Sequence, residues 1–131
     1  MFLIDTTILI DALKARRSRL EFLQRLSRSE PLAFCSIVLA ELFAGLNTQS
    51  EVSKARVDLL DTLVYVAISE NAAELAGSLQ QQYKKKGITL SLTDVMIAAV
   101  AMSEGHTLVT DNVKHFPMPE LSVMTAPATQ K

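Results

Sequence analysis

Short, uninterrupted apolar runs alternate along the chain with longer stretches in which apolar residues recur every three or four positions. Runs without polar alternation are typical of strands that are buried on both faces of a sheet. Four such runs are residues 2–4, 32–35, 63–68 and 108–109. The stretches between them have the spacing of helices that bury one face. Strands separated by helices indicate right-handed crossovers, so the sequence predicts a three-layer α/β/α fold with a mainly parallel sheet of four to five strands.

The expected helices follow the strands in order. Their ranges are residues 7–14, 18–28, 37–46, 54–60, 71–86 and 95–102. Ser36 is placed to cap the third helix. Asn71 and Ser91 each stand three residues before an acid, which is the spacing of a capping box at a helix start. We expect the polar residues 47–53 to form a loop and residues 121–124 to add a short fifth strand.

Length and composition are those of one compact domain. The chain has 131 residues, of which 49% are hydrophobic and 21% charged, and this balance argues against an intrinsically disordered chain. We expect a single domain over residues 1–125 and a frayed tail over residues 126–131. The formal charge of -1 lacks the basic signature of double-helix binders, and an aromatic content of 5% excludes widespread base stacking.

The N-terminal segment predicts neither a signal peptide nor a membrane span. It has no basic residue before its apolar run, and Asp5 interrupts that run after three apolar side chains. Cys35 is the only cysteine and stands in an apolar run, so we expect a buried thiol without a disulfide, as in a reducing compartment. The expected location is therefore the cytoplasm.

Four acidic residues stand where the predicted fold brings its elements together. Asp5 ends the first strand and Asp111 follows the fourth, while Asp94 opens a helix that is apolar on all sides. Glu41 interrupts another apolar helix, where an unpaired carboxylate is costly unless it meets a cation, a metal or a water-filled cleft. Strand ends and the first turns of the following helices lie along one edge of a three-layer fold. The four acids are therefore expected to converge there.

Each acid also has a purely structural interpretation. Asp5 would cap the helix after the first strand, and Asp94 would complete a capping box. Asp111 would form a turn. Glu41 is hardest to explain in this way, because capping does not apply in the middle of a helix. Four structural coincidences at four junctions are less plausible than one shared site.

A shared site for several carboxylates requires positive charge, because neighbouring carboxylates resist ionising together. Divalent cations supply that charge, and Mg²⁺ prefers oxygen ligands. A carboxylate and metal site of this kind suits phosphodiester hydrolysis by a metal-activated water. The two histidines and one cysteine lack the spacing of a zinc site. We therefore expect a catalytic metal site built from Asp5, Glu41, Asp94 and Asp111.

Four segments of the chain carry a resemblance to a known family. They read DTTILID at residues 5–11, SIVLAELFAGL at 36–46, LTDVMIAAVA at 92–101 and LVTDNVKHF at 108–116. Taken together and in this order, they resemble the PIN-domain family, specifically the VapC-type toxins of toxin and antitoxin pairs. The resemblance covers nearly the whole chain. It implies that Asp5, Glu41 and Asp94 correspond to the three acids that the family shares most consistently.

The resemblance implies a function as well as a fold. It implies cleavage of RNA that depends on Mg²⁺ or Mn²⁺, a homodimer, and inhibition by a small antitoxin protein. A metal-dependent endoribonuclease is therefore the main hypothesis. The alternative from another class is a non-catalytic PIN-fold module that binds a protein partner or RNA, with the acids as structural caps. Metal and carboxylate chemistry by itself also leaves DNA or a small phosphate ester open as the substrate.

The last of the four motifs departs from the family pattern. Many relatives read Thr, Arg, Asn here, with an acid just before the phenylalanine, whereas this chain has Asp111 in the motif and His115 in the later acidic position. We expect Asp111 to be the fourth ligand, with Asn112 as the alternative and His115 as a loop residue. Thr7 replaces the common Asn or Ser, and its hydroxyl is expected to hold a water or to orient Asp5. The side chains expected to support the acids are Thr6, Ser36, Thr110 and Asn112.

Basic side chains are the candidate contacts to RNA phosphates. They are Arg16, Arg17, Arg19, Lys84, Lys85, Lys86 and Lys114. Without the four acids the rest of the chain is net basic, which favours contact with phosphates. Each basic cluster is at least as well explained as a solvated helix end.

Overall fold

Five parallel strands form the sheet of this computed structural model, which describes residues 1–127. They are β1 (Phe2–Ile4), β2 (Leu32–Cys35), β3 (Val64–Val66), β4 (Thr107–Thr110) and β5 (Val123–Thr125). Their order across the sheet is β3-β2-β1-β4-β5, and each neighbouring pair is parallel. The parallel sheet that the alternation of strands and helices predicted is confirmed.

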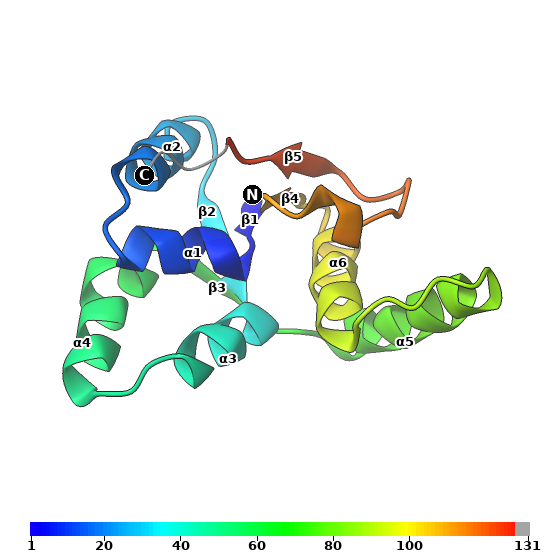
Figure 1. The fold of residues 1–131 in the computed structure, drawn as a ribbon. Coiled ribbons are helices and arrows are strands. Elements are labelled where there is room, and N and C mark those ends of the chain that lie inside the picture. The colour runs from blue at the N-terminus through cyan, green and yellow to red at the C-terminus, as the bar shows by residue number, and fades with distance from the viewer. Residues whose placement is uncertain (128–131) are drawn as a thin grey trace.

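Helices pack beside both halves of this sheet, to either side of the central strand β1. The α-helices in the described part of the chain are α1 (Thr6–Leu13), α2 (Arg17–Ser27), α3 (Ser36–Ala44), α4 (Gln49–Asp58), α5 (Glu70–Lys85) and α6 (Leu92–Glu104), and the 3₁₀ turns are η1 (Leu60–Thr62) and η2 (Val113–His115). Figure 1 shows the first four helices gathered around the half with β1, β2 and β3, while α5 packs along α6 beside β4. No helix within residues 1–127 is long and apolar enough to cross a membrane. The expected α/β/α fold is confirmed.

The central strand β1 is buried between its two neighbours. Leu3 lies opposite Ala33 of β2 and Leu108 of β4, and all three side chains are fully buried. Apolar residues occupy successive positions here because both faces of the strand are covered. Cys35 at the end of β2 is also fully buried, and burial raises the pKa of its thiol. Both observations agree with the inert cysteine expected from the sequence.

The carboxyl end of β1 is joined to β4 beyond the last paired residue. Ile4 lies opposite Val109, and the backbone N–H of Asp5 donates to the carbonyl of Val109 over 3.0 Å. The hydrogen bonding therefore continues one residue past the strand. It delivers Asp5 to the edge at which ligands of parallel sheets bind.

Two of the helix caps predicted from the sequence are at other residues in the structure. Cys35, and not Ser36, precedes the first turn of α3. The Ser36 hydroxyl instead lies 2.8 Å from the hydroxyl of Tyr65, on β3. α5 begins before Asn71, because the side chain of Ser69 accepts a backbone N–H from the first turn. The predicted caps at Ser36 and Asn71 were therefore wrong by one or two residues.

α4 covers much of the segment that was expected to be a loop. We expected a loop over residues 47–53 and a helix over residues 54–60, whereas the helix spans Gln49–Asp58. The Thr48 hydroxyl accepts the backbone N–H of Glu51 over 3.1 Å and lies 3.3 Å from its carboxylate. The first contact is half of a capping box, while the Glu51 carboxylate accepts the Thr48 hydroxyl and the backbone N–H of Asn47. The sequence contains this spacing, but the polar composition of the segment favoured a loop.

The C-terminal segment packs beside β4. β5 spans Val123–Thr125, slightly later than the strand expected over residues 121–124. Ala126 is buried, and its backbone N–H donates to the carbonyl of Thr110 over 2.8 Å. Residues 128–131 of the expected tail lie outside the described residues. The first residue of that tail therefore belongs to the packed edge of the sheet.

Arg19 differs most from its sequence prediction. We expected it in a solvated basic cluster, whereas its side chain on α2 is only 2% exposed. Its Nε donates to Asp11 over 3.1 Å. Its Nη1 donates to the carbonyl of Pro127 over 2.7 Å, and its Nη2 donates to Asp111 over 2.8 Å. Arg19 therefore joins α2 to α1, to the turn after β4 and to the segment after β5.

Replacing Arg19 tests this buried junction. Arg19→Met retains a long, unbranched side chain but removes the charge that pairs with Asp11 and Asp111. Removing one partner of a buried ion pair costs about 3 to 5 kcal/mol, so the free energy of unfolding measured in urea should fall by that amount. The matched control Arg17→Met, at a side chain that is 92% exposed, should change it by less than about 0.5 kcal/mol. Equal losses in the two variants would contradict a buried role for Arg19.

Candidate active site

Asp5 both ends β1 and caps α1. Its Oδ1 accepts the backbone N–H of Thr6 over 2.8 Å, and its Oδ2 accepts the hydroxyl of Thr110 over 2.7 Å. The residue is 7% exposed. The capping role that the sequence allowed is therefore present in the structure. It leaves each carboxylate oxygen a further lone pair with which to accept a ligand.

Three carboxylates influence one another at this edge of the sheet. Burial raises the pKa of the Asp5 carboxyl above its ordinary value, while hydrogen bonds from Thr110 and Thr6 offset part of that rise. The negative charges of Asp94 and Glu41 raise the pKa of Asp5 further. Such effects act over short distances. The structure therefore places Asp94 and Glu41 near Asp5, whereas the sequence predicted that all four acids converge.

Glu41 is oriented by the first turn of α1. Its Oε1 accepts the hydroxyl of Thr6 over 2.7 Å. Thr6 therefore contacts two acids, through its backbone N–H to Asp5 and through its hydroxyl to Glu41. The rest of Glu41 is exposed to solvent, which lowers the cost of its charge.

Asp94 lies in the first turn of α6 and faces the turn after β4. Its backbone N–H donates to the Ser91 hydroxyl over 3.1 Å, which confirms the expected cap. Its carboxylate Oδ2 lies 3.4 Å from Nδ1 of His115 in η2. The cap therefore uses the backbone of Asp94 and leaves its carboxylate for other contacts. His115, expected to be a plain loop residue, is an immediate neighbour of the acids.

Asp111 follows β4 as expected, but its carboxylate is engaged with other residues. Its Oδ1 accepts the hydroxyl of Thr7 over 2.8 Å, and its Oδ2 accepts Nη2 of Arg19 over 2.8 Å. Asp111 is not among the charges that raise the pKa of Asp5. Thr7, expected to orient Asp5 or hold a water, contacts Asp111 instead. The structure thus gathers three of the predicted acids and holds the fourth beside them.

The expected supporting side chains divide between two places. Thr110 is fully buried, donates to Asp5, and accepts the backbone N–H of Asn112 over 3.0 Å. Thr110 therefore fixes the turn after β4 against the acid at the end of β1. The Ser36 hydroxyl is paired with the Tyr65 hydroxyl and accepts the backbone N–H of Ile68, so these two bonds link it to β3 and the residues after it.

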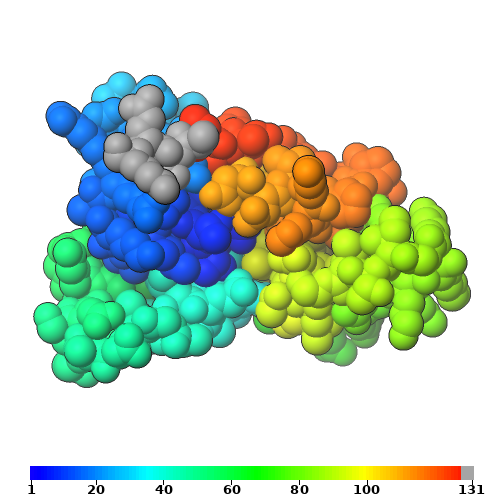
Figure 2. Space-filling view, viewed as in Figure 1, coloured from blue at the N-terminus to red at the C-terminus, as the bar shows by residue number. Residues whose placement is uncertain are grey.

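The elements that carry these residues adjoin on one face of the molecule. Figure 2 shows the dark blue start of the chain, the cyan start of α3 and the yellow α6 meeting near the middle of this face, below the orange segment after β4. Both α1 and α6 pack against α3. The acids therefore come from segments that are far apart in the sequence.

The available ligand atoms suit a hard divalent cation. They are carboxylate oxygens, which Mg²⁺ and Mn²⁺ favour. Within the described residues, no lysine or arginine forms an ion pair with Asp5, Glu41 or Asp94. In this same part of the chain, no three His, Cys, Asp or Glu side chains converge closely enough to coordinate an ion without moving. The solvent-facing carboxylates of Glu41 and Asp94 would turn toward Asp5 to do so.

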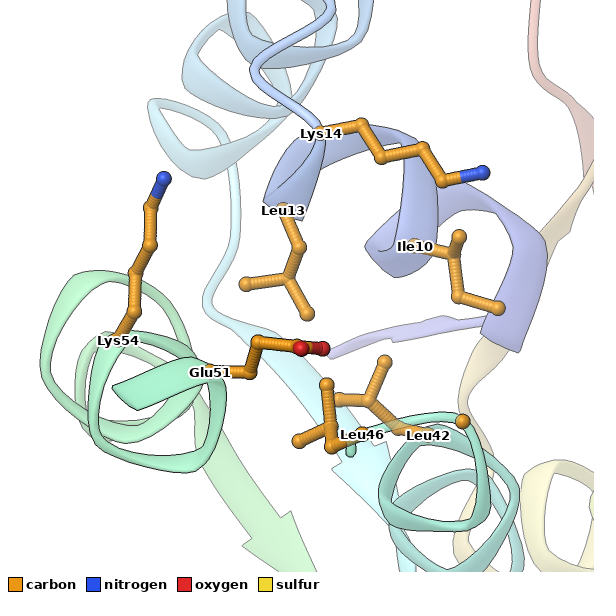
Figure 3. Close-up of a pocket in the computed structure, with 8 residues that line it drawn as sticks. Ile10, Leu13, Lys14, Leu42, Leu46, Glu51 and Lys54 are labelled. Atoms are coloured by element: carbon orange, nitrogen blue, oxygen red, sulfur yellow. The ribbon is translucent and has the colours of Figure 1, made fainter. Parts of the chain in front are cut away.

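A separate groove lies between α1, α3 and α4. It is lined by Ile10, Leu13, Lys14, Leu42, Gly45, Leu46, Glu51 and Lys54. Figure 3 shows the Glu51 carboxylate pointing in among the leucines. None of the four predicted acids lines this groove. It is therefore distinct from the edge at which the acids meet.

Comparison with known families identifies the class of protein. A model of the PIN domain matches residues 2–117, which carry strands β1 to β4 of the sheet and all four acids. The chain therefore belongs to the PIN-domain family.

Individual relatives of the chain are named as ribonucleases. Ribonuclease VapC19 of Mycobacterium tuberculosis is 33% identical over 119 residues, which cover 90% of this chain and 94% of that protein. Ribonuclease VapC2 of Rickettsia felis is 32% identical over 120 residues, which cover 88% of this chain and 90% of that protein. The resemblance to VapC-type proteins that the motifs carried is confirmed.

Solved structures share the fold over nearly the whole chain. VapBC2 from Rickettsia felis, bound to a DNA fragment from its promoter, superposes with a TM-score of 0.84 at 29% identity and covers 95% of this chain and 97% of that one. A toxin-antitoxin complex from Klebsiella pneumoniae superposes with a TM-score of 0.77 at 32% identity and covers 97% and 98%. These chains therefore match this one in fold and in length.

Asp5→Asn should stabilise the metal-free protein at neutral pH. The native pKa of Asp5 is raised, so its contribution to stability is complete below the ordinary value of 3.8 and is lost as the pH rises through the raised pKa. An amide at this position can keep both hydrogen-bond partners and carries no charge. In the presence of a chelator, the Tm of the variant should exceed that of the wild type at pH 7, and the difference should close as the pH falls toward 4.

An exposed acid provides the control for this experiment. Asp61 lies on η1 and is exposed, so Asp61→Asn should leave the dependence of Tm on pH as it is in the wild type. A lower Tm for Asp5→Asn than for the wild type at pH 7 would contradict the interpretation of Asp5 as a charge held at a cost.

Proposed function

We propose that the chain is a metal-dependent endoribonuclease and the toxin of a toxin and antitoxin pair. One observation carries the proposal: Glu41 and Asp94 lie near enough to Asp5, at the edge of the sheet, for their charges to raise its pKa, in a chain whose relatives are named ribonucleases. Within the described residues, these carboxylates have no lysine or arginine in an ion pair, which suits metal-dependent hydrolysis of phosphodiesters. The names of the relatives support RNA as the substrate.

Asp5, Glu41 and Asp94 are the residues that would hold Mg²⁺ or Mn²⁺. When bound, such an ion offsets the carboxylate charge and activates a water for attack on the phosphodiester. Two hydrogen bonds fix the Asp5 carboxylate, so its remaining lone pairs are offered in one orientation. The Thr6 hydroxyl restricts Glu41 in the same way. Ligands oriented in advance lose less entropy when they bind.

Exposed lysines are the proposed contacts to the RNA backbone. Lys114 is exposed in η2, directly before His115, whose Nδ1 lies 3.4 Å from Oδ2 of Asp94. The exposed group at the C-terminal end of α5 is Lys84, Lys85 and Lys86. Arg19 is withdrawn from the candidates because its side chain is buried and is paired with Asp11 and Asp111. The low aromatic content favours recognition of RNA shape through a few contacts.

A small antitoxin protein is the proposed partner. The structure from Klebsiella pneumoniae that matches this chain is a toxin-antitoxin complex. We infer that an antitoxin binds this chain in the same way and stops the cleavage of RNA. A homodimer, which the family resemblance implies, belongs to the same proposal.

Cleavage of RNA by the purified protein tests the main proposal. The wild type should cut single-stranded or loop RNA with Mg²⁺ or Mn²⁺ and should not do so in a chelator. Asp5→Asn, Glu41→Gln and Asp94→Asn preserve size but remove charge. Each should lower the rate by at least about a hundredfold, since even groups behind the direct ligands cost about 10- to 100-fold. Glu74→Gln, at an exposed position on α5, is the matched control and should retain the rate. Equal cutting by the wild type and the three variants would refute the proposal.

Metal-dependent stability separates this enzyme from a non-catalytic binding module of the same fold. A cation that binds only the native state adds about 2.7 kcal/mol of stability at 100 times its Kd. Mn²⁺ or Ca²⁺ should therefore raise the Tm of the wild type, and Glu41→Gln should lose most of that rise. A wild-type Tm that responds to neither cation would favour the binding module.

A further inference from the structure

A buried arginine pairs with the acid that the sequence predicted as the fourth metal ligand. We propose that Asp111 is a positioning residue and not a ligand: Arg19 withholds it from the metal, and it acts through Thr7 on the first turn of α1. The inference rests on the proposed function. It narrows the cation site to the other three acids.

Each of the three nitrogens in the Arg19 guanidinium already donates a hydrogen bond. Its side chain is 2% exposed, and Nε, Nη1 and Nη2 bind Asp11, the Pro127 carbonyl and Asp111 at 3.1, 2.7 and 2.8 Å. Taking Asp111 away would leave part of a buried positive charge unpaired, which is strongly unfavourable. A metal would have to displace this ion pair before it could use the Oδ2 atom of Asp111.

The other oxygen of Asp111 is bound to the start of α1. Its Oδ1 accepts the Thr7 hydroxyl over 2.8 Å. Thr7 directly follows Thr6, which donates its backbone N–H to Asp5 and its hydroxyl to Glu41. A bond that fixes Thr7 therefore fixes the rotation of the turn that presents Thr6. Small errors in the orientation of catalytic groups lower the reaction rate strongly.

Asp111 also differs from Asp5 and Glu41 in the charge of its hydrogen-bond partner. Asp111 has a guanidinium nitrogen at 2.8 Å, so its charge is already offset. Within the described residues, Asp5 and Glu41 have threonine hydroxyls as partners and no lysine or arginine. A divalent cation gains more from carboxylates that still carry an uncompensated charge. Asp111 is therefore the least favourable ligand of the four.

Binding of Mn²⁺ to the full chain without RNA, measured by isothermal titration calorimetry, tests this assignment. Asp94→Asn and Asp111→Asn make the same change in charge and shape. Asp94→Asn should weaken binding by about tenfold or more. Asp111→Asn should change the Kd by less than about threefold, because only a screened charge is lost. The amide of this variant can still accept from Arg19 and donate to Thr7, so the fold is retained.

The outcomes distinguish this inference from the proposed function. If the wild type binds Mn²⁺ and the two variants bind it equally weakly, Asp111 is a ligand and this inference alone is overturned. If the wild type binds no Mn²⁺, the proposed metal-dependent function is overturned and the inference falls with it.

Two substitutions at Thr7 test the positioning role. Thr7→Val keeps the shape but loses the hydroxyl, so kcat for RNA cleavage should fall by about tenfold. The Kd for Mn²⁺ should stay within about threefold of the wild type, because no ligand is removed. Thr7→Ser keeps the hydroxyl and should restore kcat. A folded Thr7→Val protein with an unchanged kcat would overturn the positioning role, since a purely structural contact would change the Tm alone.

Discussion

The buried carboxylate of Asp5 is the constraint on which the rest of the structure depends. It stands at the end of a central strand that is covered on both faces, where an ionised group loses most of its hydration. The Thr6 backbone N–H and the Thr110 hydroxyl stabilise it, and its own backbone N–H binds the carbonyl of Val109. The end of β1, the first turn of α1 and the turn after β4 are therefore arranged around one carboxylate.

The acids differ in whether their hydrogen-bond donors are neutral or positively charged. The threonine and acid pairs are Thr110 with Asp5, Thr6 with Glu41 and Thr7 with Asp111. A hydroxyl orients a carboxylate without cancelling its charge, so Asp5 and Glu41 remain able to attract a cation. Arg19 additionally offsets the charge of Asp111 and removes it from that group. Keeping the other acids uncompensated lowers stability, which is a common feature of functional sites.

The order of strands and helices was predictable because the spacing of apolar residues records whether an element is buried on one face or on two. Helix starts were less predictable. Ser36 and Asn71 have the chemistry of caps, yet Cys35 precedes α3 and Ser69 caps α5. At α5, Ser69 and Asn71 are both polar residues that can cap a helix, and Ser69 is the one that does, whereas Cys35 precedes α3 without a side-chain cap hydrogen bond. The hydroxyl of Ser36 was thereby left to contact Tyr65 on β3.

By itself, the sequence determined that acids stand at strand ends and helix starts, and that the α/β order sends them to one edge. Only the tertiary structure decided which acid meets which donor. Asp111 contacts Thr7 across 104 positions and Arg19 across 92, and no local pattern marks either pair. Because Arg19 is charged, the helical pattern predicted that it is exposed to solvent. Such a pattern shows which residues are polar but does not show which distant residues they contact. A hydrogen bond exists only within a few tenths of an ångström of its preferred length, so the final packing of distant segments decides which carboxylates keep their charge for a cation.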